Sequence, residues 1–162
     1  MKRDLWRVAL LVATSPLLLP LLIFRRTRKW PVRIAIWVGT LGCSRQAIDA
    51  LCEEFASEQA ASRSAIFHKD GLARLLDHVS KGHSVIIATG TLETLASALL
   101  AREEPRGLII IGSSMKTFLF GMIAREHCYG QKKVEMIESR GFAAPWLTAY
   151  TDLESDFWAA GK

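Results

Sequence analysis

The stretch Ser84-Val85-Ile86-Ile87-Ala88-Thr89-Gly90-Thr91 decides the fold of this chain. Its apolar part does not alternate with polar residues and is rich in β-branched side chains, as is typical of a parallel strand covered on both faces. Helical periodicity precedes it in residues 71–80 and follows it in residues 91–102. We therefore expect layers of helices around a sheet that contains this strand.

The alternation of strands and helices continues toward the C-terminus. The further elements that we expect are strands at residues 107–112 and 146–150 and a helix at residues 131–139. Residues 115–127 are ambiguous, and Gly121 is a candidate for a hairpin turn within them. The pattern predicts an α/β fold with a Rossmann-like parallel sheet over residues 63–162.

The N-terminal part is basic and apolar. Its first 33 residues hold eight basic residues and one acidic residue, Asp4. The uncharged stretch Val8–Phe24 has 17 residues, the lower limit for a helix that spans ~30 Å of hydrocarbon, and it contains two prolines. Three interpretations stay open: a transmembrane anchor, a kinked hairpin with Ile34–Cys43 in one leaflet, and a buried helix pair in a soluble protein.

The residues between the basic side chains indicate which kind of molecule the basic region binds. Basic residues bracket aliphatic side chains there and do not line a polar face. We therefore expect an anionic phospholipid surface as the partner, and no nucleic acid. Ser44 is a candidate cap for the next helix, and the polar stretch Ser57–Ser64 is a candidate connection. The predicted domains are a helical, membrane-associated region at residues 1–62 and an α/β core at residues 63–162.

Polar residues at the ends of three apolar runs are the candidate functional residues. Thr89 and Gly90 follow the first strand, Lys133 opens a helix, and Asp152 and Asp156 follow the last strand. Ligands of open parallel sheets bind beyond the carboxyl ends of the strands. A hydroxyl, an ammonium and two carboxylates suit a phosphoryl group and Mg²⁺, which prefers oxygen ligands. Each residue alone also fits a helix cap or a solvated helix start.

This combination resembles the haloacid dehalogenase superfamily of phosphatases. In that superfamily a Thr or Ser follows the second strand, a Lys opens a later helix and an acidic pair follows the fourth strand. The N-terminal Leu-Pro-Leu-Leu-Ile, Trp30-Pro31 and Trp37-Val-Gly-Thr-Leu-Gly resemble the membrane-associated cap of the phosphatidylglycerophosphatase C family. The stretches 127–134 and 149–152 resemble the lysine and metal motifs of the same family.

The resemblance implies a Mg²⁺-dependent phosphomonoesterase that acts through an aspartyl-phosphate, with phosphatidylglycerophosphate as the substrate. Thr89 and Gly90 would bind phosphate, and Lys133 would hold the phosphoryl oxygens. Asp152 would ligate Mg²⁺ directly, and Asp156 would ligate it or order its waters. The implied location is the inner, cytoplasmic membrane, with the catalytic core facing the cytoplasm. Cysteines 43, 52 and 128 form no CxxC pair, which is typical of a reducing compartment.

One motif of the superfamily is absent from the sequence. No Asp-x-Asp-Gly-Thr, whose first Asp attacks phosphorus, occurs in the 162 residues. The resemblance implies that the strand carrying it lies at the centre of the sheet, between the strands that end at Thr89 and Asp152. We therefore expect this chain to be a truncated and inactive part of a phosphatase. The alternatives are a soluble, phosphoserine-type phosphatase for a small molecule and a catalytically dead membrane-bound binding protein.

Overall fold

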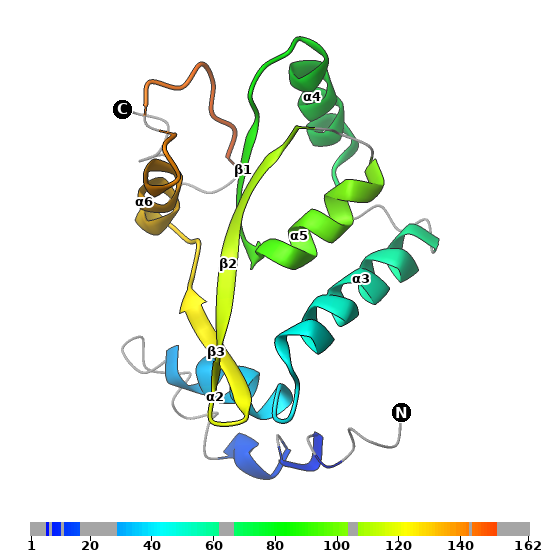
Figure 1. The fold of residues 1–162 in the computed structure, drawn as a ribbon, viewed down its shortest axis with the longest axis vertical. Helices are drawn as coiled ribbons and strands as arrows, with labels where there is room; N and C mark the ends of the chain where they lie inside the picture. Colours follow the sequence, from blue (N-terminus) through cyan, green and yellow to red (C-terminus); the bar gives the residue numbers. More distant parts are fainter. Residues whose placement is uncertain are drawn as a thin grey trace. The chain divides into compact units, whose positions relative to one another are not determined.

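A computed structural model describes residues 6, 8–10, 12–16, 29–61, 67–103, 107–142 and 144–151. The elements are α2 (Lys29–Gly39), α3 (Arg45–Ala61), α4 (Lys69–Ser80), β1 (Ile86–Leu92), α5 (Glu93–Leu100), η1 (Ala101–Glu103), β2 (Ile109–Phe118), β3 (Gly121–Glu126) and α6 (Gln131–Ser139) (Figure 1). The described residues from 8 to 16 are helical as well.

The sheet confirms the predicted α/β class. Its strand order is β1-β2-β3, and β1 runs parallel to β2. Because α5 lies between these two strands in the chain, β1, α5 and β2 form the β–α–β unit of a Rossmann-like sheet. The ambiguous residues form a hairpin, since only two residues, Leu119 and Phe120, separate β2 from β3. Gly121 begins β3 and does not form the turn itself.

The predicted helices at residues 71–80 and 131–139 are confirmed as α4 and α6. The hydroxyl of Ser44 accepts a hydrogen bond from the backbone N–H of Ala47 at 3.1 Å, as expected of a cap at the start of α3. α5 begins at Glu93, two residues later than the expected helix, because the strand before it continues further.

The predicted strand at residues 146–150 is wrong. No strand is assigned to residues 144–151. Trp146 instead packs with Phe142 against the buried core, and its indole N–H donates to the carbonyl of Phe142 at 3.3 Å. A strand needs a neighbour that completes its backbone hydrogen bonds. Residues 145–151 line a cavity, and the packing of Trp146 anchors this segment to the core.

The chain divides into two compact units that are interleaved in sequence. The first unit comprises Met1–Ile48 and Met115–Arg125, and the second comprises Asp49–Ser114 and Glu126–Lys162. The predicted boundary between residues 62 and 63 lies in a segment outside the described residues and stays a prediction. Over the parts of the chain that the structure describes, which include Val8–Phe24 only as far as residue 16, no helix has the length and apolar character needed to cross a bilayer.

The core of the second unit lies beside β2. Ile111, Cys128, Met136 and Ile137 are buried together there. Residues of β1 and the loop after α6 pack against this cluster. α6 therefore contributes its second turn to the core and leaves its first turn, which contains Lys133, at the margin.

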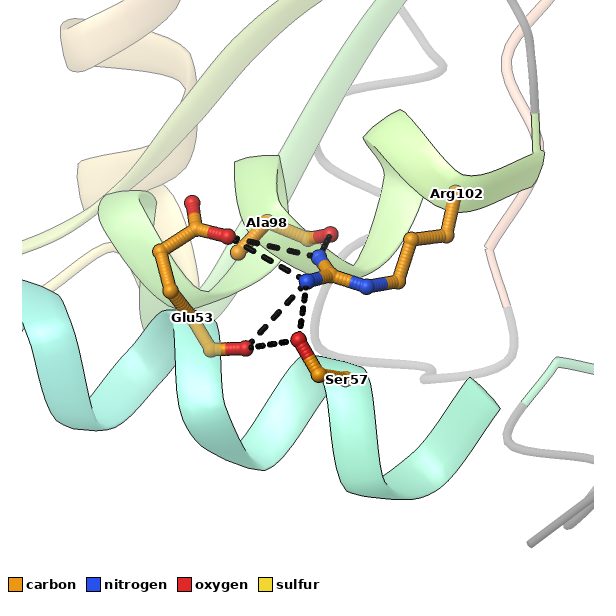
Figure 2. A network of polar contacts seen from close by, with 4 residues as sticks. All are labelled: Glu53, Ser57, Ala98 and Arg102. Carbon is orange, nitrogen blue, oxygen red and sulfur yellow. Dashed lines mark hydrogen bonds and ion pairs between the residues drawn. The ribbon is translucent and has the colours of Figure 1, made fainter. Parts of the chain in front are cut away.

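The guanidinium group of Arg102 joins α3 to α5 and η1. Figure 2 shows Arg102 reaching from η1 to α3, where it donates to the side chain of Glu53 at 3.3 Å, to the Glu53 carbonyl at 3.2 Å and to the Ser57 hydroxyl at 2.6 Å. It also donates to the carbonyl of Ala98. The Arg102 side chain is only 27% exposed, so these bonds are partly shielded from water.

Replacing Arg102 with Lys tests this contact. A lysine keeps the charge but lacks the planar fork of donors that reaches four acceptors. We expect Arg102→Lys to lower the free energy of unfolding by about 1–3 kcal/mol, as measured by urea denaturation. Arg33→Lys, at an exposed position of α2, is the control and should leave the midpoint unchanged. Equal midpoints for both variants would show that the fork of Arg102 does not hold α3.

Candidate active site

The Thr89-Gly90-Thr91 segment is a break in the pairing of β1 with β2. Ala88 pairs with Ile111, but the next paired residue of β1 is Leu92, which lies opposite Ser113. Three residues of β1 thus lie opposite a single residue of β2, as in a bulge. Thr89 was predicted to follow the strand and Thr91 to begin a helix, and both expectations are wrong. The strand includes both residues and ends at Leu92.

Ser113 holds this bulge in place. Its buried hydroxyl donates to the carbonyl of Gly90 at 2.7 Å and accepts from the backbone N–H of Cys128 at 3.1 Å. The Nδ1 atom of His127 lies 3.1 Å from the same hydroxyl. Within the bulge, the N–H of Thr91 donates to the hydroxyl of Thr89 at 3.2 Å. One serine therefore joins the irregular part of β1 to the segment after β3.

Close contact between α5 and β2 sets the start of α5. A Cβ atom on Gly112 would lie 2.6 Å from the Cα of Glu93, so only glycine allows this approach. The carboxylate of Glu93 accepts from the N–H of Gly112 at 3.2 Å and from Arg140 at 3.0 Å. Gly90 is less restricted, because a Cβ there would meet its nearest atom, the Cys128 carbonyl oxygen, at 3.6 Å.

The two adjacent lysines of α6 have different surroundings. Lys132 is exposed and forms an ion pair with Glu135 at 2.6 Å. The hydrogen bond to Glu135 raises the pKa of Lys132 above its usual value. Lys133 is half-buried and lines the cavity of the second unit. Of the two lysines, Lys133 is therefore the one that can contact a molecule in this cavity.

The cavity has a volume of about 830 Å³ and runs along the edge of β1. Consecutive residues from Val85 to Ala88 all line it. Because side chains of a strand point alternately to opposite faces, such a run indicates contact along the edge of the strand and not over one face. Residues of α4 and α6 line it as well, and so does the whole segment from Pro145 to Thr151.

The structure thus brings some of the predicted site residues toward one place. Lys133 and Thr151 line the same cavity, and Thr151 directly precedes Asp152. Thr89 and Gly90 do not line it, although the neighbouring Ala88 does. Asp152 and Asp156 lie outside the described residues, so their placement stays a prediction. Where residues are described, no group of three or more His, Cys, Asp or Glu side chains gathers at one place.

The sequence analysis did not predict two hydrogen-bonded clusters of side chains, one around Ser113 and one around His78. Ser113 follows the apolar run of β2 just as Thr89 follows that of β1, and this parallel is the signal that could have indicated it. At the cavity, His78 lies 2.8 Å from His83 between their Nδ1 atoms and 3.1 Å from the hydroxyl of Tyr150. No sequence spacing predicts this second cluster, because Tyr150 is 72 residues away from His78.

The fold and the cavity together define an α/β protein of the Rossmann-like class, in which a lysine lines the same cavity as the first strand. The family profile of the haloacid dehalogenase-like hydrolases matches residues 1–160. The chain therefore belongs to the haloacid dehalogenase-like hydrolase family. No curated protein and no solved structure matches it.

Replacing Ser113 with Ala tests the support of the bulge. The variant leaves the Gly90 carbonyl and the Cys128 N–H without their partner, and a buried polar group without a hydrogen bond costs about 1–3 kcal/mol. We expect Ser113→Ala to lower the thermal unfolding midpoint clearly. Ser114→Ala is the matched control, because the Ser114 hydroxyl bonds only the exposed Glu126 carboxylate among the contacts seen, at 3.3 Å. A control that unfolds as early as the variant would refute the role of Ser113.

Proposed function

We propose that this chain forms the phosphate-binding and metal-binding part of a phosphomonoesterase that acts through an aspartyl-phosphate. The observation that supports this most is the position of Lys133. It lines the cavity together with the segment that leads into Asp152, and the neighbouring Lys132 does not line this cavity. A lysine at such a place neutralises the negative charge that develops on a transferred phosphoryl group.

The nucleophile of this reaction is an aspartate on a strand that pairs with the edge of β1. β1 is the end strand of the sheet order β1-β2-β3, and its other edge faces the cavity. The apolar residues Ile86 and Ile87 remain only half-buried there. An extended apolar segment would complete their burial and their backbone hydrogen bonds. Its carboxyl end would then lie near the bulge at Thr89 and near Lys133.

Mg²⁺ is the metal that the donor set fits. Asp152 and Asp156 supply two hard carboxylate oxygens, which suit an ion that keeps several water molecules. When bound, the ion would neutralise charge on the phosphoryl oxygens. In this chain, Lys133 would hold the phosphoryl oxygens, and the hydroxyl of Thr89 and the N–H of Gly90 would bind the same group. The bulge keeps Thr89 and Gly90 out of regular pairing with β2, which supports this role.

The substrate that we propose is a lipid phosphate, phosphatidylglycerophosphate, at the cytoplasmic face of the inner membrane. Support comes from the resemblance of the N-terminal and lysine segments to the phosphatidylglycerophosphatase C family. The basic and apolar composition of the first 33 residues also fits an anionic phospholipid surface. A small soluble phosphate ester is the competing substrate, and it is distinguished by comparing hydrolysis in micelles and in buffer.

Complementation with a peptide tests the proposed nucleophile strand. The chain is mixed with an apolar peptide that ends in Asp-x-Asp-Gly-Thr, and phosphate release from phosphatidylglycerophosphate in mixed micelles is followed with and without Mg²⁺. We expect Mg²⁺-dependent hydrolysis only with the peptide. A peptide with Asn in place of the first Asp is the control and should bind without hydrolysis. Hydrolysis with the Asn peptide, or no binding of either peptide, would contradict the proposal.

The role of Lys133 can be tested by comparing its alanine variant with that of the adjacent Lys132. In the complemented protein, we expect Lys133→Ala to lower kcat/KM about a hundredfold or more, because a donor to the developing charge is lost. Lys132→Ala removes only the exposed pair with Glu135 and should have little effect. The same assay with Asp152→Ala should show no Mg²⁺-dependent turnover. An equal loss at both lysines would show that the register of α6 at the cavity is wrong.

A further inference from the structure

The turn between β2 and β3 exposes three consecutive apolar side chains. Phe118, Leu119 and Phe120 are 48%, 63% and 85% exposed. We call these three residues the hairpin tip. Leu119 and Phe120 both have positive φ angles, of 41° and 63°. Such a backbone is strained for residues other than Gly and Asn, so the exposed bulky side chains are not a by-product of a favourable turn.

The backbone carbonyls of the hairpin tip are all hydrogen-bonded. The indole N–H of Trp37 donates to the carbonyl of Phe118 at 3.0 Å and to that of Leu119 at 3.2 Å. The N–H of Gly42 donates to the carbonyl of Phe120 at 2.6 Å. In hydrocarbon, a carbonyl without a partner costs several kcal/mol. These three carbonyls can therefore leave water without losing hydrogen bonds.

The hairpin tip is also fixed in shape by the C-terminal end of α2. A Cβ atom on Gly121 would lie 2.7 Å from the indole ring of Trp37, so glycine is required for this close packing. The hydroxyl of Thr40 accepts from the N–H of Met122 at 2.8 Å. The tip is thus held before any partner arrives, and little conformational entropy is lost on binding.

Charge is divided sharply between the two units. The first unit, Met1–Ile48 with Met115–Arg125, contains eleven basic residues and one acidic residue, a formal net charge of +10. The second unit contains ten basic and fifteen acidic residues, a net charge of −5. The basic side chains of the first unit that the structure describes are all exposed, namely Arg33, Arg45, Lys116 and Arg125. Lys116 lies two residues before the hairpin tip.

We propose that the hairpin tip inserts into the interface of an anionic phospholipid bilayer, with Lys116 and other basic residues of the first unit at the headgroups. Aromatic and aliphatic side chains beside lysine and arginine are the combination that binds such an interface. A symmetric contact between the hairpin tips of two copies fits less well, because it brings together two units of charge +10, which repel each other. The inference rests on the membrane association proposed above but names a different element, far in sequence from the N-terminal apolar stretch.

Vesicle flotation of the full chain tests the insertion. The vesicles contain phosphatidylcholine alone or phosphatidylcholine mixed with phosphatidylglycerol. The test variant is Leu119→Asn/Phe120→Asn, since Asn adopts positive φ readily and the carbonyl bonds to Trp37 and Gly42 do not depend on the side chains. We expect the wild type to float with the anionic vesicles and the variant to lose about tenfold or more in partition coefficient.

The matched control also removes one leucine and one phenylalanine. Leu51 and Phe55 on α3 are 54% and 44% exposed and belong to the second unit. Leu51→Gln/Phe55→Gln should float as the wild type does. Circular dichroism melts should show that both variants are folded. An equal loss in both variants, or no loss in the hairpin-tip variant, would overturn the proposal.

Two further outcomes separate the alternatives. If the wild type forms dimers in sedimentation equilibrium and the hairpin-tip variant does not, the tip is a contact between copies and the proposal fails. If flotation occurs as expected but the complemented chain hydrolyses no phosphate ester, the phosphatase proposal fails while the membrane surface stands. The measurement of binding uses no enzymatic readout, so the two proposals are tested separately.

Discussion

The arrangement of the second unit depends on the hydroxyl of one buried serine. Ser113 lies where the register of β1 against β2 shifts, and it bonds Gly90 on one side and Cys128 on the other. A bulge leaves backbone groups without their ladder partners, and in a buried place each needs a replacement. The serine supplies that replacement, so β1 can bend out of regular pairing at Thr89 while the core beside Ile111 stays closed.

The elements that the sequence predicted correctly are those with a strong local period. α4 and α6 carry amphipathic patterns, and β1 and β2 carry uninterrupted apolar runs. The predicted strand at residues 146–150 failed because its apolar pattern needs a neighbouring strand, which no local signal reports. The bulge at Thr89–Thr91 was not predicted, for a similar reason. Its stability comes from Ser113, 23 residues away from Gly90, so a strand end after Ala88 was the only local interpretation.

The candidate site, too, contains one part that the local sequence predicts and one part that depends on distant residues. The sequence placed Lys132 and Lys133 at the start of a helix, and the family resemblance selected Lys133. In the structure, Lys133 lines the cavity and Lys132 does not; Lys132 pairs with Glu135 one turn further along the same helix. The cavity could not be predicted at all, because it is bounded by β1, α4, α6 and the segment before Asp152. The cavity lies along the outer edge of β1 in the sheet order β1-β2-β3. The strand that the proposed reaction requires would pair with β1 at this edge, as the resemblance to the family implies.

The division of charge gives the two units different physical tasks. An acidic unit is repelled from an anionic bilayer, whereas a unit of net charge +10 is attracted to it, and exposed apolar side chains add binding once contact is made. The continuous strands β2 and β3 run from one unit into the other. β2 therefore carries both Ser113 of the second unit and Phe118 of the hairpin tip.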